Sequence, residues 1–134
     1  MACAAIALAV SGCATAVRFR SSEASNPVAT ATVLGSRYHG IASYYHDSFH
    51  GRRTASGEIF RQDELVAAHP SLPFGTLVRV TNVRNGRSVV VRITDRGPHV
   101  AGRILDVSRA AAEQLGMIAE GLAEIEITIL ELPQ

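Results

Sequence analysis

Two runs rich in β-branched residues most constrain what this chain can fold into. The first covers Thr76 to Asn82, the second covers Ser88 to Thr94, and Asn85-Gly86 lies between them. β-branched side chains favour strands. Asn-Gly tolerates the positive φ of a two-residue type I′ turn, whose twist matches that of the flanking strands. The pattern therefore predicts a β-hairpin.

Other segments add short elements of both kinds. Near the C-terminus, isoleucines at positions 125, 127 and 129 alternate with polar residues, which predicts a final strand with one buried face. Ser108 suits the N-cap of a helix from Arg109 to Leu115, and Gly116 suits the position just past its end. We also expect a helical turn at 62–66 and short strands at 40–45 and 67–69. Brief strands with small helices indicate an all-β fold with little helix, a closed or nearly closed barrel.

The chain has 134 residues, of which 47% are hydrophobic, so it is long enough for one domain with its own core. The formal net charge is +1, so no broad positive field points to nucleic acid. We expect a monomer. Trp is absent, so aromatic contacts with a sugar would fall to three tyrosines, Tyr38, Tyr44 and Tyr45.

The N-terminal segment has the features of an export signal. Ala2 to Val10 is apolar and too short to span a bilayer as a helix. It ends in Val10-Ser11-Gly12-Cys13, which resembles a bacterial lipobox. We expect a lipoprotein signal peptide at 1–12, lipidation of Cys13, a flexible tether at 13–37 and a folded domain at 38–132, held on the periplasmic side of a membrane in the bacterial cell envelope. The alternative is that Cys13 is incidental, since no basic residue precedes Arg18.

Two polar loops could carry chemistry. One contains Gly51 to Glu58, and the other, Asp95 to Pro98, directly follows a strand that reads as buried. Glycosidic cleavage needs a carboxylic acid that can give a proton to the leaving oxygen. Glu58 is the favoured proton donor and Asp95 the second carboxylate of the same site. On the residues alone, the interpretation of both as ordinary turn residues is favoured.

The remaining polar residues have ordinary explanations as well. His69, in an apolar stretch, can be a core histidine, and Asp106 precedes a helix start, where a negative charge is favoured. The five histidines show none of the spacings of familiar zinc sites, so we expect no metal and no cofactor. Neither cysteine lies in the predicted domain, and no GxSxG motif is present, which argues against a Cys or Ser nucleophile.

Several ordered motifs resemble the rare lipoprotein A family. They are Gly40-Ile41-Ala42-Ser43-Tyr44-Tyr45, Phe49 to Glu58, Ala67 to Thr76, Val78 to Asn82, Asn85-Gly86-Arg87, Val91 to Pro98 and Arg103 to Ser108. They follow the order and spacing of the family and cover essentially the whole domain from Gly40 to Leu130.

The resemblance implies a six-stranded double-psi β-barrel with one or two short helices, an architecture shared with expansins. It also implies a lytic transglycosylase of peptidoglycan. Such an enzyme cuts between N-acetylmuramic acid and N-acetylglucosamine in strands stripped of stem peptides. The 6-hydroxyl of the sugar attacks its own anomeric carbon and leaves a 1,6-anhydro end, so one acid/base carboxylate can suffice.

By the matched motifs, Asp95, Glu58 and His69 fall on the family's active-site positions. Either carboxylate could be the general acid and then base, with His69 orienting a carboxylate or the glycan. We assign substrate binding to Tyr44, Arg52, Thr54, Arg96 and Asp106.

The sequence departs from the family pattern Gly-Glu-x-Tyr-Asp, because Phe60 and Arg61 replace its last two residues. A cation close to Glu58 would hold it ionised and make it a poorer acid. Arg61 therefore favours an alternative function, a peptidoglycan-binding or expansin-like wall-loosening lipoprotein that does not cleave. A structural envelope lipoprotein is a third possibility.

Overall fold

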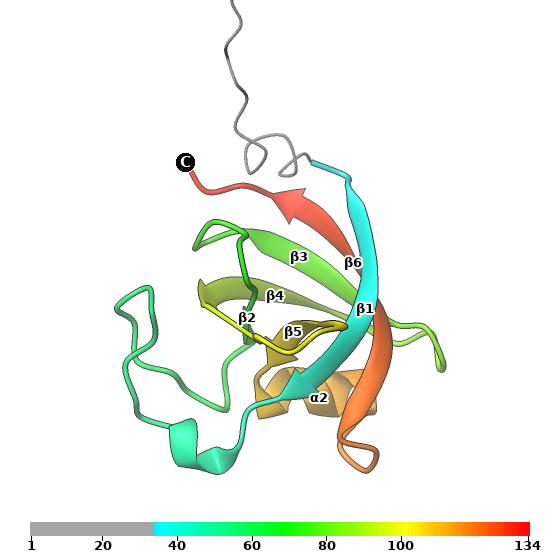
Figure 1. Cartoon of the computed structure of the whole chain (residues 1–134), viewed down its shortest axis with the longest axis horizontal. Coiled ribbons are helices and arrows are strands. Elements are labelled where there is room, and N and C mark those ends of the chain that lie inside the picture. Colours follow the sequence, from blue (N-terminus) through cyan, green and yellow to red (C-terminus); the bar gives the residue numbers. More distant parts are fainter. Residues whose placement is uncertain (1–33) are drawn as a thin grey trace, which may run out of the picture. The chain divides into compact units, whose positions relative to one another are not determined.

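A computed structural model describes residues 34–134, and within this range six strands close into a barrel (Figure 1). Their order around the barrel is β1-β5-β2-β4-β3-β6. The strands are β1 (Arg37–Tyr44), β2 (Val66–Ala68), β3 (Leu77–Asn82), β4 (Ser88–Asp95), β5 (Arg103–Val107) and β6 (Leu122–Glu131). The predicted six-stranded barrel is confirmed.

Two parallel strand pairs, β1 with β5 and β2 with β4, are joined by antiparallel pairing of β2 with β5. The consecutive strands β1 and β2 are not neighbours, because β5 lies between them. The connection that follows β1 runs from Tyr45 to Leu65 and projects from the barrel as the long green loop in Figure 1. The carboxyl ends of β1, β4 and β5 lie near this loop, which makes that end of the barrel the place for a site.

Alternating apolar residues fill the interior. On β6, Ile125, Ile127 and Ile129 are buried, as their spacing predicted. They pack with buried aliphatic residues of the other strands, including Val78, Val80, Val91, Ile93, Leu105 and Val107. Burying one such side chain contributes about 1.5–3 kcal/mol. The buried residues inside the barrel are mostly aliphatic, with Tyr38, Tyr44 and Phe74 packed against them.

Helix α2 (Arg109–Leu115) has the predicted bounds. The Ser108 side chain accepts a hydrogen bond from the Ala111 amide, and Gly116 ends the helix in the left-handed conformation (φ 68°, ψ 34°). The helical turn predicted at 62–66 is wrong. The short helix of this connection, η1 (Asp47–Phe49), lies earlier in the chain, and 62–65 is irregular backbone leading into β2.

The predicted hairpin exists as β3 and β4, but its turn is longer than two residues. The Gly86 amide donates to the Asn82 carbonyl, and the Asn82 amide donates to the Arg87 carbonyl. Asn85 is used for a tertiary contact, because its Nδ2 donates to the Leu115 carbonyl at 3.0 Å. The turn therefore caps the C-terminal end of α2, which a local turn rule does not anticipate.

The predicted signal peptide at 1–12, Cys13 and most of the predicted tether at 13–37 lie outside the described residues. Within them, ordered pairing starts slightly before the predicted domain start at Tyr38. The Gly35 amide donates to the Ile129 carbonyl, and β1 begins at Arg37. Over positions 34–134, no helix has the length and apolarity needed to cross a membrane.

Candidate active site

Strand register brings two acidic residues to the same end of the barrel. Ala68 of β2 pairs with Asp95 of β4 on one side and with Asp106 of β5 on the other. Ser43 of β1 pairs in turn with Asp106. Neighbouring strands lie about 4.8 Å apart, so the backbones of Asp95 and Asp106 are roughly 10 Å apart across Ala68. Residues 11 positions apart in sequence thus become near neighbours in the sheet.

The Asp95 carboxylate is held by three donors. Its Oδ2 accepts a hydrogen bond from the Tyr45 hydroxyl at 2.6 Å. Its Oδ1 accepts from the backbone amides of Ala55 and Arg96, both at 2.9 Å. Since both oxygens are engaged, the orientation of this half-buried carboxylate is set by β4, by the end of β1 and by the connecting loop.

Tyr45 is fixed by aromatic neighbours as well. Its ring centroid lies 4.2 Å from that of Phe60 and 5.5 Å from that of Phe49, the latter in an edge-to-face arrangement. Burial, followed by the hydrogen bond with Asp95, raises the pKa of Tyr45 well above its ordinary value. The hydroxyl therefore stays protonated at neutral pH and remains a donor to Asp95.

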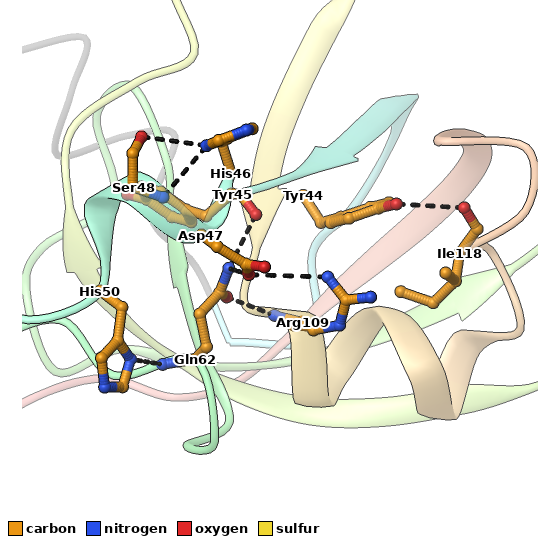
Figure 2. Close-up of polar contacts among 9 residues, drawn as sticks. All are labelled: Tyr44, Tyr45, His46, Asp47, Ser48, His50, Gln62, Arg109 and Ile118. Atoms are coloured by element: carbon orange, nitrogen blue, oxygen red, sulfur yellow. Dashed lines mark hydrogen bonds and ion pairs between the residues drawn. The ribbon is translucent and has the colours of Figure 1, made fainter.

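Gln62 ties the loop to the helix (Figure 2). Its Nε2 donates to the Tyr45 carbonyl at 2.8 Å and to Asp47 Oδ1 at 3.0 Å. Its Oε1 accepts from the Arg109 amide at 2.7 Å, at the start of α2. Its own amide donates to His50 Nδ1 at 3.0 Å. One side chain thus anchors the peptide of Tyr45 and, through it, the Asp95 contact.

A groove of about 450 Å³ runs along this end of the barrel. Asp95 and Asp106, the two residues that pair with Ala68, both line the groove. Asp106 also accepts a hydrogen bond from the Ser43 hydroxyl. The other lining residues come from the end of β1, from η1, from the β4–β5 loop and from the start of β5, and include Tyr44, Tyr45, Phe49, Arg96, Val100 and Arg103. The groove thus combines two acids, cations and apolar walls.

Glu58 has a different environment. It does not line the groove. Both of its oxygens are bound by the Arg92 guanidinium, at 2.7 and 2.9 Å. These hydrogen bonds lower the pKa of Glu58, so its carboxylate stays ionised at neutral pH. The side chain is 48% exposed. This is the reverse of what a proton donor needs.

The expected effect of a cation on Glu58 is therefore present, but the cation is Arg92 of β4. Arg61, which the sequence suggested for this role, forms a separate ion pair with Asp63 at 3.5 Å. Phe60, the neighbouring departure from the family pattern, is buried against Tyr45.

His69 shapes the loop that follows β2. Its Nδ1 accepts hydrogen bonds from the amides of Ser71 and Leu72, both at 3.0 Å. Burial, aided by the charge of Arg96, lowers the pKa of His69 to about 4, so the ring is neutral at pH 7. Its own amide donates to the Asp95 carbonyl at 3.1 Å. His69 does not line the groove and contacts Asp95 through the backbone.

The residues assigned to substrate binding divide into two groups. Tyr44, Arg96 and Asp106 line the groove, whereas Arg52 and Thr54 do not. The Arg52 guanidinium lies 5.4 Å from the centre of the Phe49 ring. Thr54 is buried, and its hydroxyl contacts Ser56 and the Glu58 carbonyl inside the loop.

Arg96 and Tyr44 use part of their polar groups within the protein. The Arg96 guanidinium lies 4.0 Å from the centre of the Phe74 ring and donates to the His69 carbonyl at 3.3 Å. The Tyr44 hydroxyl donates to the Ile118 carbonyl at 3.1 Å (Figure 2). Both residues therefore present surfaces to the groove that are already fixed in position.

Sequence reasoning gave no specific role to the groove residues Ser43, Phe49 and Arg103, or to Gln62 behind them. It named Tyr45 only as one of three tyrosines for aromatic contacts with a sugar. Tyr45 directly follows the end of β1, a position from which a rigid strand can present a side chain. This position was the one feature of the sequence that could have pointed to Tyr45 as a site residue. The role of Gln62 depends on contacts with residues 15 to 47 positions away, and no local pattern reveals it.

Two further features bear on alternatives. Over the described residues, no group of three or more His, Cys, Asp and Glu side chains gathers as a metal site would require. A second hollow, of about 560 Å³, lies between the β3–β4 turn and the start of β6 and is lined by Asn85, Gly116 and Leu122 among others. None of the predicted catalytic residues lines it.

Comparison with known families matches residues 37–127 to the family described as lytic transglycolase. The chain belongs to this family. The match begins with β1 and ends inside β6, so it spans the lytic transglycolase barrel and both acidic residues of the groove.

Curated relatives of this lytic transglycolase domain carry the name of the family that the motifs suggested. A probable endolytic peptidoglycan transglycosylase RlpA from Nostoc sp. is 54% identical over 113 residues, which cover 79% of this chain and 30% of the relative. The endolytic peptidoglycan transglycosylase RlpA of Pasteurella multocida is 52% identical over 93 residues, or 69% of this chain and 32% of the relative. The resemblance to the rare lipoprotein A family is confirmed. The chain spans about a third of the length of these relatives.

Solved structures support the fold. A Streptomyces papain inhibitor matches with a TM-score of 0.61 and 23% identity, over 73% of this chain and 97% of the inhibitor. The apo expansin of Clavibacter michiganensis matches with a TM-score of 0.58 and 24% identity, over 74% of this chain and 52% of the expansin. The lytic transglycolase domain is thus a double-psi β-barrel, as predicted.

Proposed function

We propose that this chain is a lytic transglycosylase of peptidoglycan. It cuts the bond between N-acetylmuramic acid and N-acetylglucosamine in glycan strands that lack stem peptides. The observation that carries the proposal is the pairing of Ala68 with Asp95 on one side and with Asp106 on the other, which places both acidic residues in one groove. The names of relatives that are more than 50% identical support the same reaction.

Asp95 is the proposed acid and base. As an acid, it gives its proton to the glycosidic oxygen while the bond from that oxygen to the anomeric carbon breaks. The 6-hydroxyl of the muramic residue then attacks the anomeric carbon and returns its proton to Asp95. This closes a 1,6-anhydro ring, regenerates the acid and consumes no water. The three donors around Asp95 hold the carboxyl group in one orientation for both transfers.

Asp106 is the proposed second carboxylate. Positive charge develops at the anomeric carbon as the bond breaks, and a fixed negative group nearby stabilises it. The Ser43 hydroxyl orients Asp106 from the neighbouring strand. Tyr44 and Arg96 would contact the glycan from the groove walls. Glu58 and His69 act behind the groove, by holding β4 and the loop after β2.

The test is a product assay with the full chain and denuded glycan strands. We expect new 1,6-anhydro ends, which resist borohydride reduction because they carry no free hemiacetal, and mass spectrometry identifies them. Reducing ends would instead indicate hydrolysis and contradict the proposed chemistry. Sedimentation with strands that stay uncut would select the alternative, a wall-binding module.

That alternative rested on Arg61 as the cation that holds Glu58 ionised. Arg61 pairs with Asp63, and Glu58 does not line the groove, so the substitution at position 61 leaves the acids of the groove unchanged. The expansin-like fold permits binding without cleavage. Cleavage is the better supported function.

For the location of the protein, we propose attachment to a membrane of the bacterial envelope through lipid on Cys13, with the monomeric barrel on the periplasmic side. The support is the residue pattern that ends in Cys13. Labelled palmitate should be incorporated into the chain in a bacterial host and not into a Cys13→Ser variant. Equal labelling of both would contradict lipidation at this residue.

A further inference from the structure

Arg103 differs from the other arginines that lack partners. Among residues 34–134, four arginines have a guanidinium group without a hydrogen bond, ion pair or ring contact, namely Arg37, Arg79, Arg84 and Arg103. Three of them are exposed, so water solvates their charge. Arg103 is half-buried and lines the groove that contains Asp95 and Asp106.

Partial burial of an unpaired guanidinium costs free energy, because the group loses part of its hydration without a compensating partner. The other half-buried arginines of the described chain offset this cost within the protein. Arg92 pairs with Glu58, Arg109 with Asp47, and Arg96 donates to a carbonyl and lies against Phe74. An uncompensated guanidinium in an open groove is suited to a ligand that brings its own anion.

We propose that Arg103 binds the lactyl carboxylate of N-acetylmuramic acid and thereby selects strands without stem peptides. The inference rests on the proposed function. In a denuded strand this carboxylate is free and anionic, whereas a stem peptide converts it into a neutral amide. A guanidinium binds a carboxylate through two parallel hydrogen bonds, which an amide cannot accept in the same way. Selection for bare strands is then a charge effect at a single subsite.

The position of Arg103 fits this role. It begins β5, three residues before Asp106, and it pairs with Ile41 of β1. The lactyl group is an ether substituent on the sugar ring whose anomeric carbon reacts. A cation on the same strand as Asp106 can therefore hold that ring while the two carboxylates act at the anomeric centre.

The test compares two forms of the same denuded strands, one with free lactyl carboxylates and one with these groups converted to methyl amides. Binding of the full chain is measured by calorimetry. A charge-assisted hydrogen bond contributes enough that we expect about ten-fold tighter binding of the free carboxylate form. An Arg103→Gln variant should bind both forms alike. Arg103→Lys should retain part of the preference, because lysine keeps the positive charge but cannot donate two parallel hydrogen bonds.

Arg79→Gln is the matched control, because Arg79 is an exposed arginine on β3 outside the groove. It should keep the full preference. Equal binding of both strand forms by the unmodified chain would overturn the proposal, and so would an Arg103→Gln variant that keeps the preference. The binding of the two strand forms by the unmodified chain tests the proposal even if the Arg103 variants do not fold.

Failure of this inference can be told apart from failure of the proposed function. If anhydro ends formed equally from both strand forms, the proposed lytic activity would be supported and the proposed role of Arg103 would be contradicted. If the chain preferred the free carboxylate form but cleaved neither form, the role of Arg103 would be supported and the proposed lytic activity would be contradicted. Absence of glycan binding would contradict both.

Discussion

Asp95 and Glu58 are two acidic residues at β4 with different surroundings. Asp95 ends β4, lines the groove and accepts hydrogen bonds from a tyrosine hydroxyl and two backbone amides. Glu58, on the loop after β1, is bound by the Arg92 guanidinium and lies outside the groove. The Arg92 guanidinium brings a full positive charge to Glu58 and keeps it ionised. Of the two residues, only Asp95 lies in the groove, with its orientation set by its donors.

The difference teaches that an acidic residue is better judged by its donors than by its motif. Both residues match family positions, and from the sequence Glu58 had the stronger claim to be the proton donor. The contacts of the two residues differ. Asp95 is oriented within the groove, whereas Glu58 holds the loop against β4 through Arg92.

The largest change besides loss of Asp95 itself should come from Asp106→Asn. Asn keeps the size of the side chain and can still bond Ser43, but it removes the negative charge near the anomeric carbon. We expect kcat to fall by about 100-fold or more, with little change in stability. The anhydro-end assay with a thermal unfolding control measures both. Activity within about three-fold of the original chain would place the second acid elsewhere.

The His69 amide donates to the Asp95 carbonyl, and the contribution of the neutral His69 ring to stability can be tested by changing the pH. The pKa of His69 in the folded chain is about 4, below its ordinary value of 6.5, so the unfolded chain takes up a proton first as the pH falls. The contribution to stability is therefore complete above about pH 6.5 and is lost between pH 6.5 and 4, by up to about 3 kcal/mol. Urea unfolding across this range measures the loss.

His69→Asn is the matched variant, because the amide oxygen of Asn can accept from Ser71 and Leu72 in place of Nδ1 and does not titrate. Its free energy of unfolding should be flatter over the same pH range. A slope as steep as that of the original chain would show that another group titrates there.

The aromatic support of Asp95 predicts a smaller effect. Tyr45→Phe removes the hydroxyl that donates to Asp95 and keeps the packing against Phe60. We expect kcat to fall by about ten-fold, as for loss of one hydrogen bond to a charged group, with KM nearly unchanged. Tyr44→Phe is the control, because that hydroxyl bonds the Ile118 carbonyl. Equal losses in both variants would contradict a specific role for Tyr45.

The smallest effect should come from the other side of the comparison. The pair of Glu58 and Arg92 is partly exposed, so a double-mutant cycle with Glu58→Gln and Arg92→Gln should give a coupling below about 1 kcal/mol. Because the pKa of Glu58 is lowered by folding, this contribution is present above its ordinary value and is lost as the pH falls below it. A coupling that persists at pH 2 would mean that the pair is not ionic.

Much of the barrel could be predicted from the sequence, because its elements depend on local patterns. The alternating isoleucines of β6, the β-branched runs of β3 and β4, and the caps of α2 each follow from residues close in sequence. The turn at Asn85 was mispredicted because its side chain bonds a carbonyl 30 residues away. Distant partners override local turn preferences.

The site could be predicted only in part, for the same reason. Family motifs identified Asp95, but its environment depends on Tyr45, 50 residues away, and on the Ala55 amide, 40 residues away. The meeting of Asp95 with Asp106 follows from the parallel and antiparallel pairing of Ala68. The cation beside Glu58 was sought at Arg61, three residues away, and lies at Arg92, 34 residues away.

One pair of variants tests the central claim most directly, namely the rate of anhydro-end formation by Asp95→Asn and by Glu58→Gln under the same conditions. If Asp95 is the acid and base of the groove, Asp95→Asn should lose about 1,000-fold in rate, while Glu58→Gln should lose no more than about ten-fold. The reverse order, with the Asp95 variant active and the Glu58 variant inactive, would contradict it.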